Sequence, residues 1–462
     1  MQHDKQADAV IVGAGLTGLT TAYYLKKKGL DVVVIEKDQR PGGVIQTFRE
    51  EGFVYEAGPN TGVLSHPEVA ELFEELEGSC RLEIADPEAK RRLIWKSGGW
   101  HALPGGPVSA LTTPLFSFRD KLGILGEPFR AKGTDPLETL EELVIRRLGK
   151  SYLDYAVDPF ISGIYAGDPS RLVTKYALPK LYALEQNYGS FIRGAIKKRA
   201  ETKDARTQKA TKEVFSAEGG LGSLIDALVL RLGKERIWTG VFGASVARAG
   251  DHFEVTVQMD GATRKIRTPR VISTIDAPRL PGLFPFIDKA SFSDILTLKY
   301  SAVVQAIAGF THWKGMDLNA FGGLVPSREK RDILGVLFTS SFLKNRAPAG
   351  GALLSVFLGG YRRPELAGLS GAETETLVLR EIREMLGVKE PDPSLFRIFR
   401  YRRAIPQYGK TSEERLEAIS RIQAQHPGLY LAGGVRDGIG MADRIRQARH
   451  IAEAVAGNGQ TP

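Results

Sequence analysis

Near its amino terminus the chain reads Ala9-Val-Ile-Val-Gly13-Ala-Gly15-Leu-Thr-Gly18. The first four residues have the composition of a short buried strand, and residues 19–28 have the apolar spacing of a helix that stops at Gly29. The next stretch, Asp31-Val-Val-Val-Ile-Glu36, predicts a second strand that ends in an acid. The order of strand, glycine loop, helix and acidic strand end is typical of a dinucleotide-binding unit in a Rossmann-like α/β fold.

Each glycine has a separate role in such a loop. Gly13 permits the tight turn, Gly15 lets the backbone approach a pyrophosphate, and Gly18 lets the helix pack against the strand. The amino terminus of the helix attracts phosphate charge, and the carboxylate of Glu36 can bind a ribose hydroxyl. This pattern does not separate NAD from FAD, because both molecules carry an ADP half.

Composition and charge narrow the class of protein. A chain of 462 residues can bury the cores of two or three domains. The single cysteine, Cys80, excludes an intrachain disulfide, and the seven histidines form no zinc-finger spacing, so we expect no bound metal. The net charge of +9 favours acidic ligands or anionic surfaces, but the basic stretch 193–212 has little aromatic interleaving and we expect no nucleic-acid partner.

The distribution of apolar and charged residues also bears on location. The first eight residues include three charged ones, where a secretory signal needs an apolar core, and no apolar run approaches the roughly 20 residues that span a bilayer. We therefore expect a cytoplasmic protein. The stretch 193–212 is interpreted as exposed surface, with peripheral contact to anionic lipid at the inner face of the membrane as the alternative. A homodimer is left open.

The pattern of elements predicts three domains around a mixed α/β architecture. We expect a discontinuous nucleotide-binding domain from 1–85, 213–290 and 395–462, with strand patterns at 237–257 and 265–273. Residues 86–102 and 291–394 predict an antiparallel-sheet substrate domain, with a hairpin turn at Ser97-Gly98-Gly99. Residues 103–212 have helical patterning with Pro and Gly interruptions and predict a helical lobe.

Further glycine-rich segments follow the first loop, Arg40-Pro-Gly42-Gly43-Val44 and Ala57-Gly58-Pro59-Asn60, and another lies near the carboxyl terminus, from Gly433 to Met441. Together they resemble the FAD-binding segments of the amine-oxidase superfamily. The resemblance implies that FAD is the cofactor, that the backbone near Gly243 contacts adenine, and that a helix starting near Gly440 points its positive end at the flavin ring. The expected cofactor-binding residues are Gly13, Ala14, Gly15, Leu16, Thr17, Gly18, Glu36, Lys37, Gly42, Gly43, Val44, Ala57, Gly58, Pro59, Asn60, Gly243, Gly433, Ile439, Gly440 and Met441.

The middle of the chain carries the most specific resemblance. Asp158-Pro-Phe-Ile-Ser-Gly163-Ile-Tyr-Ala-Gly167-Asp168 and Phe321-Gly-Gly-Leu-Val-Pro-Ser are very similar to plant-type protoporphyrinogen oxidases, and matches continue in order along nearly the whole chain. The resemblance implies oxidation of protoporphyrinogen IX to protoporphyrin IX with O2 as acceptor and H2O2 as product, the penultimate step of haem biosynthesis. Because the flavin carries the hydride transfer, no catalytic side chain is expected.

A porphyrinogen is a large, mostly apolar macrocycle with propionate arms, so its site should combine an apolar slot with a basic rim. The resemblance implies that Leu324, Leu337 and Phe357 wall the slot, with Gly167 beside it and Arg92 pairing a propionate. From the sequence alone the three apolar residues would be assigned to a core, and Arg91 leaves the register of the basic residue open.

Three alternatives stay open on the sequence. The chain could be a coproporphyrinogen III oxidase, which would need more basic residues at the rim of the slot to pair additional carboxylates. It could be an amine oxidase or carotenoid desaturase of the same superfamily, although an amine oxidase usually needs an aromatic cage of which no second member is identified. It could also be a non-catalytic FAD-binding redox protein.

Overall fold

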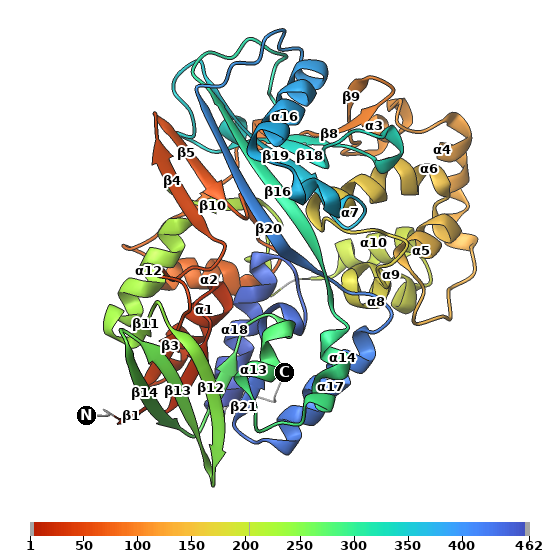
Figure 1. Cartoon of the computed structure of the whole chain (residues 1–462). Helices are drawn as coiled ribbons and strands as arrows, with labels where there is room; N and C mark the ends of the chain where they lie inside the picture. The colour runs from red at the N-terminus through yellow and green to blue at the C-terminus, as the bar shows by residue number, and fades with distance from the viewer. Residues whose placement is uncertain (1–3, 203, 458–462) are drawn as a thin grey trace.

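The structure is a computed structural model that describes residues 4–202 and 204–457. A five-stranded parallel sheet forms its lower part in the view of Figure 1. The inner strands are short apolar runs buried on both faces, as parallel strands covered by helices require. The strands are, in sheet order, β11 (Ile237–Trp238), β3 (Val32–Ile35), β2 (Ala9–Val12), β15 (Val271–Ser273) and β21 (Leu429–Leu431).

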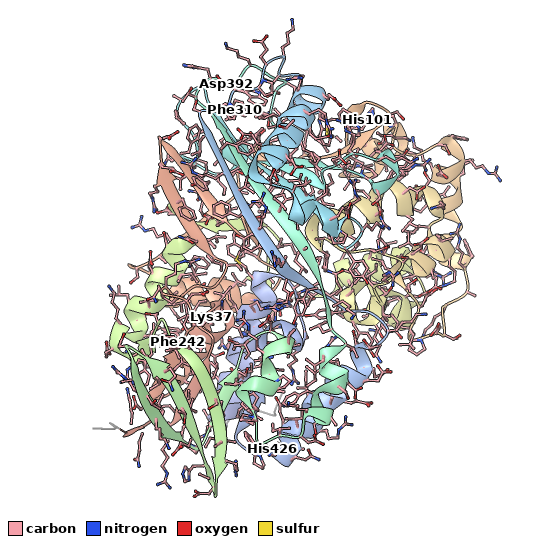
Figure 2. All side chains as sticks on the ribbon, viewed as in Figure 1. Lys37, His101, Phe242, Phe310, Asp392 and His426 are labelled. Atoms are coloured by element: carbon pink, nitrogen blue, oxygen red, sulfur yellow. The ribbon has the colours of Figure 1, made fainter. Side chains whose placement is uncertain are left out.

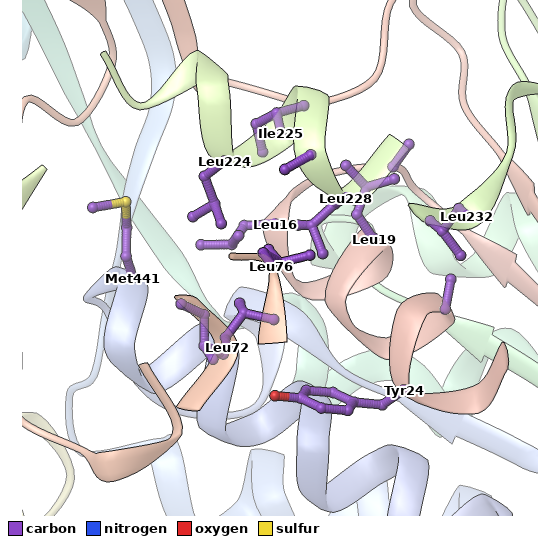
Figure 3. Close-up of a cluster of buried hydrophobic side chains, with 14 of the residues drawn as sticks. Leu16, Leu19, Tyr24, Leu72, Leu76, Leu224, Ile225, Leu228, Leu232 and Met441 are labelled. Atoms are coloured by element: carbon purple, nitrogen blue, oxygen red, sulfur yellow. The ribbon is translucent and has the colours of Figure 1, made fainter. Parts of the chain in front are cut away.

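Helices cover one face of this sheet with a leucine-rich core. The helix predicted after the glycine loop is α1 (Leu16–Lys27), and the amphipathic helix predicted at the carboxyl end is α18 (Met441–Val455). They pack with α2 (Pro67–Glu75) and α12 (Gly222–Leu232). Figure 3 shows the side chains that meet there, which include Leu16, Leu19, Leu72, Leu76, Leu224, Leu228, Leu232 and Met441.

The opposite face of the parallel sheet is covered by a second, four-stranded sheet and by α17 (Ser412–Gln425). The strands predicted in 237–257 and 265–273 are confirmed, but turns divide them more finely than the alternation suggested. In sheet order the four strands are β1 (Asp4–Gln6), β14 (Ala262–Thr268), β13 (His252–Met259) and β12 (Phe242–Ala249).

A seven-stranded sheet forms the upper part of the molecule (Figure 1). It is antiparallel as predicted, except that β17 and β8 pair in parallel. Ser97 and Gly98 both have positive φ, the backbone that a two-residue hairpin turn needs, and they join β8 to β9 as predicted. In sheet order the strands are β20 (Leu395–Gln407), β16 (Lys299–Phe310), β19 (Ala352–Gly359), β18 (Gly335–Phe338), β17 (Gly322–Leu324), β8 (Arg92–Lys96) and β9 (Gly99–Ala102).

One predicted boundary needs correction. Residues 395–407, assigned by sequence to the nucleotide-binding part, form β20, which pairs along most of its length with β16 of the seven-stranded sheet. The sequence analysis predicted no strand in this segment, and its pairing with the distant β16 is not a local signal. The division of the chain into three domains otherwise stays a prediction.

Helix α16 (Gly371–Leu386) covers one face of the seven-stranded sheet, while the other face meets the parallel-sheet region. The junction also includes the hairpin of β4 (Gln46–Glu50) and β5 (Phe53–Ala57), which packs on β16. Beside it lies a small sheet of β6 (Gly62–Val63), β10 (Val214–Ala217) and β7 (Leu82–Ile84).

The helical lobe predicted at 103–212 is present and has its own small core. Its centre holds a fully buried ion pair between Arg147 and Glu127, and Arg146 bonds Glu185 at 2.8 Å. Among the described residues, no helix is both long and apolar enough to cross a membrane. The main helices are α3 (Pro107–Thr112), α4 (Phe118–Leu125), α5 (Leu140–Arg147), α7 (Asp158–Ile164), α8 (Thr174–Ala177), α9 (Pro179–Tyr188) and α10 (Phe191–Ala200).

Candidate cofactor and substrate site

The glycine loop is built for close packing on one side and open space on the other. A Cβ on Gly18 would lie 1.9 Å from the carbonyl oxygen of Gly13, so α1 can rest on the loop only because residue 18 lacks a side chain. A Cβ on Gly15, in contrast, would meet nothing within 4 Å. Because Gly15 also begins α1 without a side-chain cap, the first N–H groups of the helix face this space and can bind a phosphate.

Glu36 lies directly against the glycine loop, and its ribose contact stays a prediction. Its carboxylate is buried and accepts hydrogen bonds from the backbone N–H of Ala14 at 2.8 Å and of Asp38 at 3.0 Å. The glycine loop and the acidic strand end are therefore joined directly. The neighbouring Lys37 has an exposed side chain that pairs with Asp38, so only its backbone is positioned to contact a buried ligand.

Gly42 and Gly43 pack directly over the first glycine loop. The N–H of Gly42 donates to the carbonyl of Ala14 at 2.7 Å, and a Cβ on Gly43 would lie 3.3 Å from the Cα of Gly15. Arg40 donates to the carbonyl of Gly43 at 2.8 Å and stabilises the turn. Val44 is largely exposed.

The carboxyl-terminal loop reaches the same edge of the parallel sheet. A Cβ on Gly433 would lie 2.9 Å from the carbonyl oxygen of Thr274, whose side-chain oxygen in turn would lie 2.6 Å from a Cβ on Gly13. Helix α18 begins at Met441 with Gly440 as its N-cap, as predicted. The first loop and the last are thus brought together across more than 400 residues of sequence, as a shared binding site requires.

Gly243 lies in β12, near the residue that bonds the backbone of Glu36. It adopts a φ of +61° within an irregular stretch of β12, and the preceding Val241 donates its N–H to the carbonyl of Glu36 at 2.9 Å. Figure 2 shows Lys37 and Phe242 on the same side of the parallel-sheet region. An adenine contact at Gly243 remains a prediction consistent with this position.

Residues 57–60 connect the cofactor loops to the seven-stranded sheet. The N–H of Gly58 donates to the side-chain oxygen of Gln305 at 2.8 Å, and the hydroxyl of Ser355 donates to Asn60 Oδ1 at 2.9 Å. Gln305 and Ser355 come from β16 and β19, so their side of the sheet faces the cofactor loops.

The three predicted slot residues lie on that same side. The strand register aligns Leu324 with Gly335 and Phe357, and it aligns Leu337 with Ser355 in the neighbouring row. Each is the one incompletely buried residue of its strand. Residues that alternate with them, such as Val336 and Val356, lie on the opposite face and pack against α16. The register therefore places Leu324, Leu337 and Phe357 on one partly buried apolar face, where Leu324 also packs against the cluster of Ile94 and Leu337 against that of Phe342.

Arg92 lies at the edge of this surface. The register aligns it with Gly322 and hence with Leu337, and its exposed guanidinium is 5.8 Å from the ring centroid of Phe321. No ion pair among the described residues includes Arg92. Arg91 instead donates to the carbonyl of Asn319 at 3.0 Å, so of the two arginines only Arg92 is available on the slot side.

Gly167 lies in the helical lobe, where the lobe meets the end of β20. It is buried, and a Cβ at this position would lie 2.7 Å from the side-chain oxygen of Gln407 and 3.1 Å from Leu172. Its missing side chain therefore serves the packing of the helical lobe against the end of β20. Its predicted role beside the slot stays a prediction.

The sequence analysis did not identify the pair that His66 and Asp443 form at the start of α18. His66 is buried with its Nε2 3.1 Å from Asp443 Oδ1, and Asp443 Oδ2 accepts the N–H groups of Ile439 and Gly440. Burial alone raises the pKa of Asp443, but the bonds from His66 and the backbone outweigh it and lower the pKa to about 2. Asp443, three residues after Gly440, is a capping signal that can be found in the sequence. Its partner His66 lies 377 residues away, so no local pattern indicates the pair.

Glu56 is the other unusual acid of the site. Its carboxylate is buried beside the cofactor loops and accepts hydrogen bonds from Leu221 N and Thr47 Oγ1, both at 2.8 Å. Burial raises the pKa of Glu56 to about 7, against the opposing effect of these bonds. The native protein therefore holds this proton more tightly than the unfolded chain does.

We expect Glu56→Gln to flatten the pH dependence of stability. In the wild type the contribution of Glu56 is complete below pH 4.5 and is lost as the pH rises through about 7, a fall of roughly 3 kcal/mol in the free energy of unfolding. Glutamine stays neutral and should lack this fall. Urea unfolding at pH 5 and pH 8 measures it, with the exposed Glu77→Gln as control; an unchanged pH dependence in Glu56→Gln would contradict the assignment.

The residues at the glycine loop fit an adenine dinucleotide. The open space over Gly15, the uncapped start of α1 and the buried acid Glu36 supply the pyrophosphate and ribose contacts that such a ligand needs. The loops at 42–44, 57–60 and 433–441 extend the site from this end toward the apolar surface of the seven-stranded sheet.

Comparison with known proteins identifies the family of this chain. The family model described as flavin-containing amine oxidoreductase matches residues 16–456. Protoporphyrinogen oxidase 2 of Arabidopsis thaliana is 30% identical, with 98% of this chain and 95% of the relative covered. Coproporphyrinogen III oxidase of Bacillus subtilis is 24% identical, with 96% and 97% covered.

Solved structures agree on the fold. A crystal structure from Exiguobacterium superposes with a TM-score of 0.81 at 24% identity, covering 99% of both chains. Reduced UDP-galactopyranose mutase gives a TM-score of 0.73 at 17% identity, covering 98% of this chain and 96% of that one. At these identities the similarity establishes the architecture alone.

Proposed function

Because this chain belongs to the flavin-containing amine oxidoreductase family, we propose that it is an FAD-dependent oxidase that converts protoporphyrinogen IX to protoporphyrin IX. O2 is the acceptor and H2O2 the product, and the reaction is the penultimate step of haem biosynthesis. The observation that carries the proposal is the partly buried apolar face of Leu324, Leu337 and Phe357, with Arg92 at its edge and the cofactor loops opposite.

The cofactor follows from two independent observations. The family is flavin-containing, and the glycine loop with Glu36 fits an adenine dinucleotide, so FAD is the flavin that satisfies both. Gly15 and the first turn of α1 would hold the pyrophosphate, Glu36 the ribose, and the start of α18 would place its positive end near the flavin ring. When bound, the flavin supplies the hydride acceptor.

The protein then has to orient the substrate and exclude water. The side chains of Leu324, Leu337 and Phe357 present an apolar surface to the macrocycle, and Arg92 provides a guanidinium for one propionate. No side chain is assigned an acid or base role, since hydride removal requires none from the protein. Aromaticity of the product supplies the driving force.

The experiment is paired turnover of the FAD-loaded protein on protoporphyrinogen IX and coproporphyrinogen III, with porphyrin fluorescence and peroxide followed together. We expect faster turnover on protoporphyrinogen IX, because Arg92 at the edge can pair one propionate, whereas a tetracarboxylate needs further basic partners. Faster turnover on coproporphyrinogen III would select the alternative oxidase. Turnover of neither would contradict the proposal and favour a non-catalytic flavoprotein.

A membrane surface is the second element of the proposal. Six apolar side chains on and after α3 and α4 are more than half exposed, and basic residues such as Arg119 lie among them. Part of the basic stretch 193–212, for which lipid contact was the alternative interpretation, is neutralised, since Arg206 pairs with Glu68 and Glu71 at 2.7 Å. The lipid-facing residues are therefore Val108, Leu111, Phe118, Leu122, Leu125 and Phe129.

We expect the double substitution Phe118→Asp and Leu122→Asp to lower binding to phosphatidylglycerol vesicles by about tenfold or more, because two inserted side chains are lost and two like charges added. Co-sedimentation measures the bound fraction. Leu230→Asp, at an exposed apolar position on α12, is the control. Equal binding of both variants and the wild type would contradict this assignment.

Location and assembly complete the proposal. We expect the protein in the cytoplasm, in contact with the inner face of the membrane through the α3–α4 surface. A homodimer stays open, and light scattering of the FAD-loaded protein tests it directly.

A further inference from the structure

His66 is a buried histidine to which the proposed chemistry gives no role. It is the N-cap residue of α2 and is 8% exposed, and its Nε2 lies 3.1 Å from Oδ1 of Asp443 in the first turn of α18. Histidine is the side chain whose charge most readily changes between pH 5 and 8. The pair of His66 and Asp443 can therefore carry either no net charge or one negative charge.

Asp443 supplies the fixed charge of this pair. Its other oxygen, Oδ2, accepts the N–H groups of Ile439 at 3.2 Å and Gly440 at 3.1 Å, which holds the carboxylate against the end of the cofactor loop. Burial raises the pKa of Asp443, but the bonds from His66 and the backbone lower it to about 2. Asp443 is therefore ionised throughout the range in which a histidine changes charge.

Two titratable groups of the helical lobe also face the pair. Lys180 of α9 donates to the carbonyl of Ser65 at 3.2 Å, and its pKa is lowered by burial, against the attraction of Asp443. The pKa of Tyr165, just after α7, is raised to about 12, first by burial and then by Asp443. Near pH 7 Lys180 is thus a cation and Tyr165 is neutral.

The charged groups on the two helices themselves are fixed. Arg446 of α18 is half-exposed, with its Nη2 4.0 Å from Asp443 Oδ1. Glu68, in the first turn of α2, pairs with Arg206 at 2.7 Å. Of the groups that surround Asp443, His66 is therefore the one expected to change its charge near neutral pH.

The start of α18 lies at the cofactor site. Its first residue, Met441, packs so closely on the segment after residues 57–60 that a Cβ on Gly62 would lie 2.9 Å from Met441 Cε. This inference rests on the proposed binding of FAD, in which the positive end of α18 lies near the flavin ring. A hydride carries two electrons and one proton, so the group that accepts it gains one negative charge. A fixed charge at the start of α18 therefore changes the reduction equilibrium.

We propose that His66, acting through Asp443, adjusts the midpoint potential of the bound flavin. Protonated His66 neutralises Asp443, and the positive end of α18 then favours the negative charge that arrives with the hydride. When His66 loses its proton, the charge of Asp443 is no longer balanced by this partner and opposes reduction. His66 is thus a positioning residue, and the flavin is easier to reduce when His66 is protonated.

The test is a reductive titration of the FAD-loaded protein with dithionite and reference redox dyes, which needs no porphyrinogen. In His66→Gln we expect the midpoint potential at pH 6 to fall by about 30 mV, a tenfold change in a two-electron equilibrium, and to match the wild type at pH 9. His450→Gln, at an exposed position on the same helix, should match the wild type at both pH values.

Asp443→Asn provides a second measurement if His66→Gln does not fold. Asparagine keeps an oxygen acceptor for the N–H groups of Ile439 and Gly440 but removes the charge, so the potential at pH 9 should rise by about 30 mV.

Equal potentials of His66→Gln and the wild type at pH 6 would overturn the proposal, as would an unchanged potential of Asp443→Asn at pH 9. A shift in His66→Gln of the same size at pH 6 and pH 9 would also overturn it, because the loss of a packing contact does not depend on pH. A protein that shows the expected shifts but oxidises no porphyrinogen would contradict the proposed function and leave this inference intact.

Discussion

Gly15→Asp is expected to weaken FAD binding by about 100-fold or more while the protein stays folded. The residue has an ordinary helical-entry backbone, with φ of −71°, and a Cβ there meets nothing within 4 Å, so the side chain fits. It would place a carboxylate in the space that the pyrophosphate needs. The repulsion between these two negative groups at contact distance is about 3 kcal/mol, which corresponds to about 100-fold in affinity. Titration of the apoprotein with FAD, followed by flavin fluorescence, measures the affinity.

The control for this substitution is Gly371→Asp. Gly371 also stands at the start of a helix, as the first residue of α16, with no atom within 4 Å of its Cβ position, but it is far from the glycine loop. It should bind FAD like the wild type, and the thermal stability of both apoproteins should match that of the wild-type apoprotein. Normal FAD affinity in Gly15→Asp would show that the pyrophosphate does not lie at this loop.

Arg92→Ala is expected to lower kcat/KM for the porphyrinogen by about 10- to 100-fold, mainly through KM. The guanidinium forms no ion pair within the described residues and stands on the slot side of β8, so its loss removes a substrate contact rather than a structural one. A charge-assisted bond to a propionate at a partly solvated edge is worth about 1.5 to 3 kcal/mol. Steady-state kinetics on protoporphyrinogen IX provide the measurement.

Arg91→Ala is the matched control, since Arg91 is adjacent but bonds the carbonyl of Asn319. Its kcat/KM should stay within about twofold of the wild type. If the two variants lose activity equally, or if Arg92→Ala lowers kcat with KM unchanged, then Arg92 does not act by pairing a propionate.

The parts of the fold that local sequence determines were predicted well. The glycine loop, α1, the acidic end after β3 and the start of α18 each depend on residues close together in the chain, and each is confirmed. Pairings between distant segments were not predictable. Residues 395–407 were assigned to the nucleotide-binding domain, whereas they form a strand of the seven-stranded sheet, and the parallel pairing of β17 with β8 joins strands more than 200 residues apart.

The same distinction applies to the site. Leu324, Leu337 and Phe357 have the sequence pattern of ordinary core residues, and the register across three strands is needed to place them on one face. The choice between Arg91 and Arg92 likewise depends on which side of β8 each residue faces. The pair of His66 and Asp443 joins the starts of two helices, which no local pattern could indicate.

The most direct test of the account is anaerobic mixing of the FAD-loaded protein with protoporphyrinogen IX. We expect the visible absorbance of the bound flavin to bleach in proportion to enzyme, and to recover with release of peroxide when oxygen is admitted. A protein that holds FAD but shows no bleaching with either protoporphyrinogen IX or coproporphyrinogen III would contradict the assignment of porphyrinogen oxidation to this site.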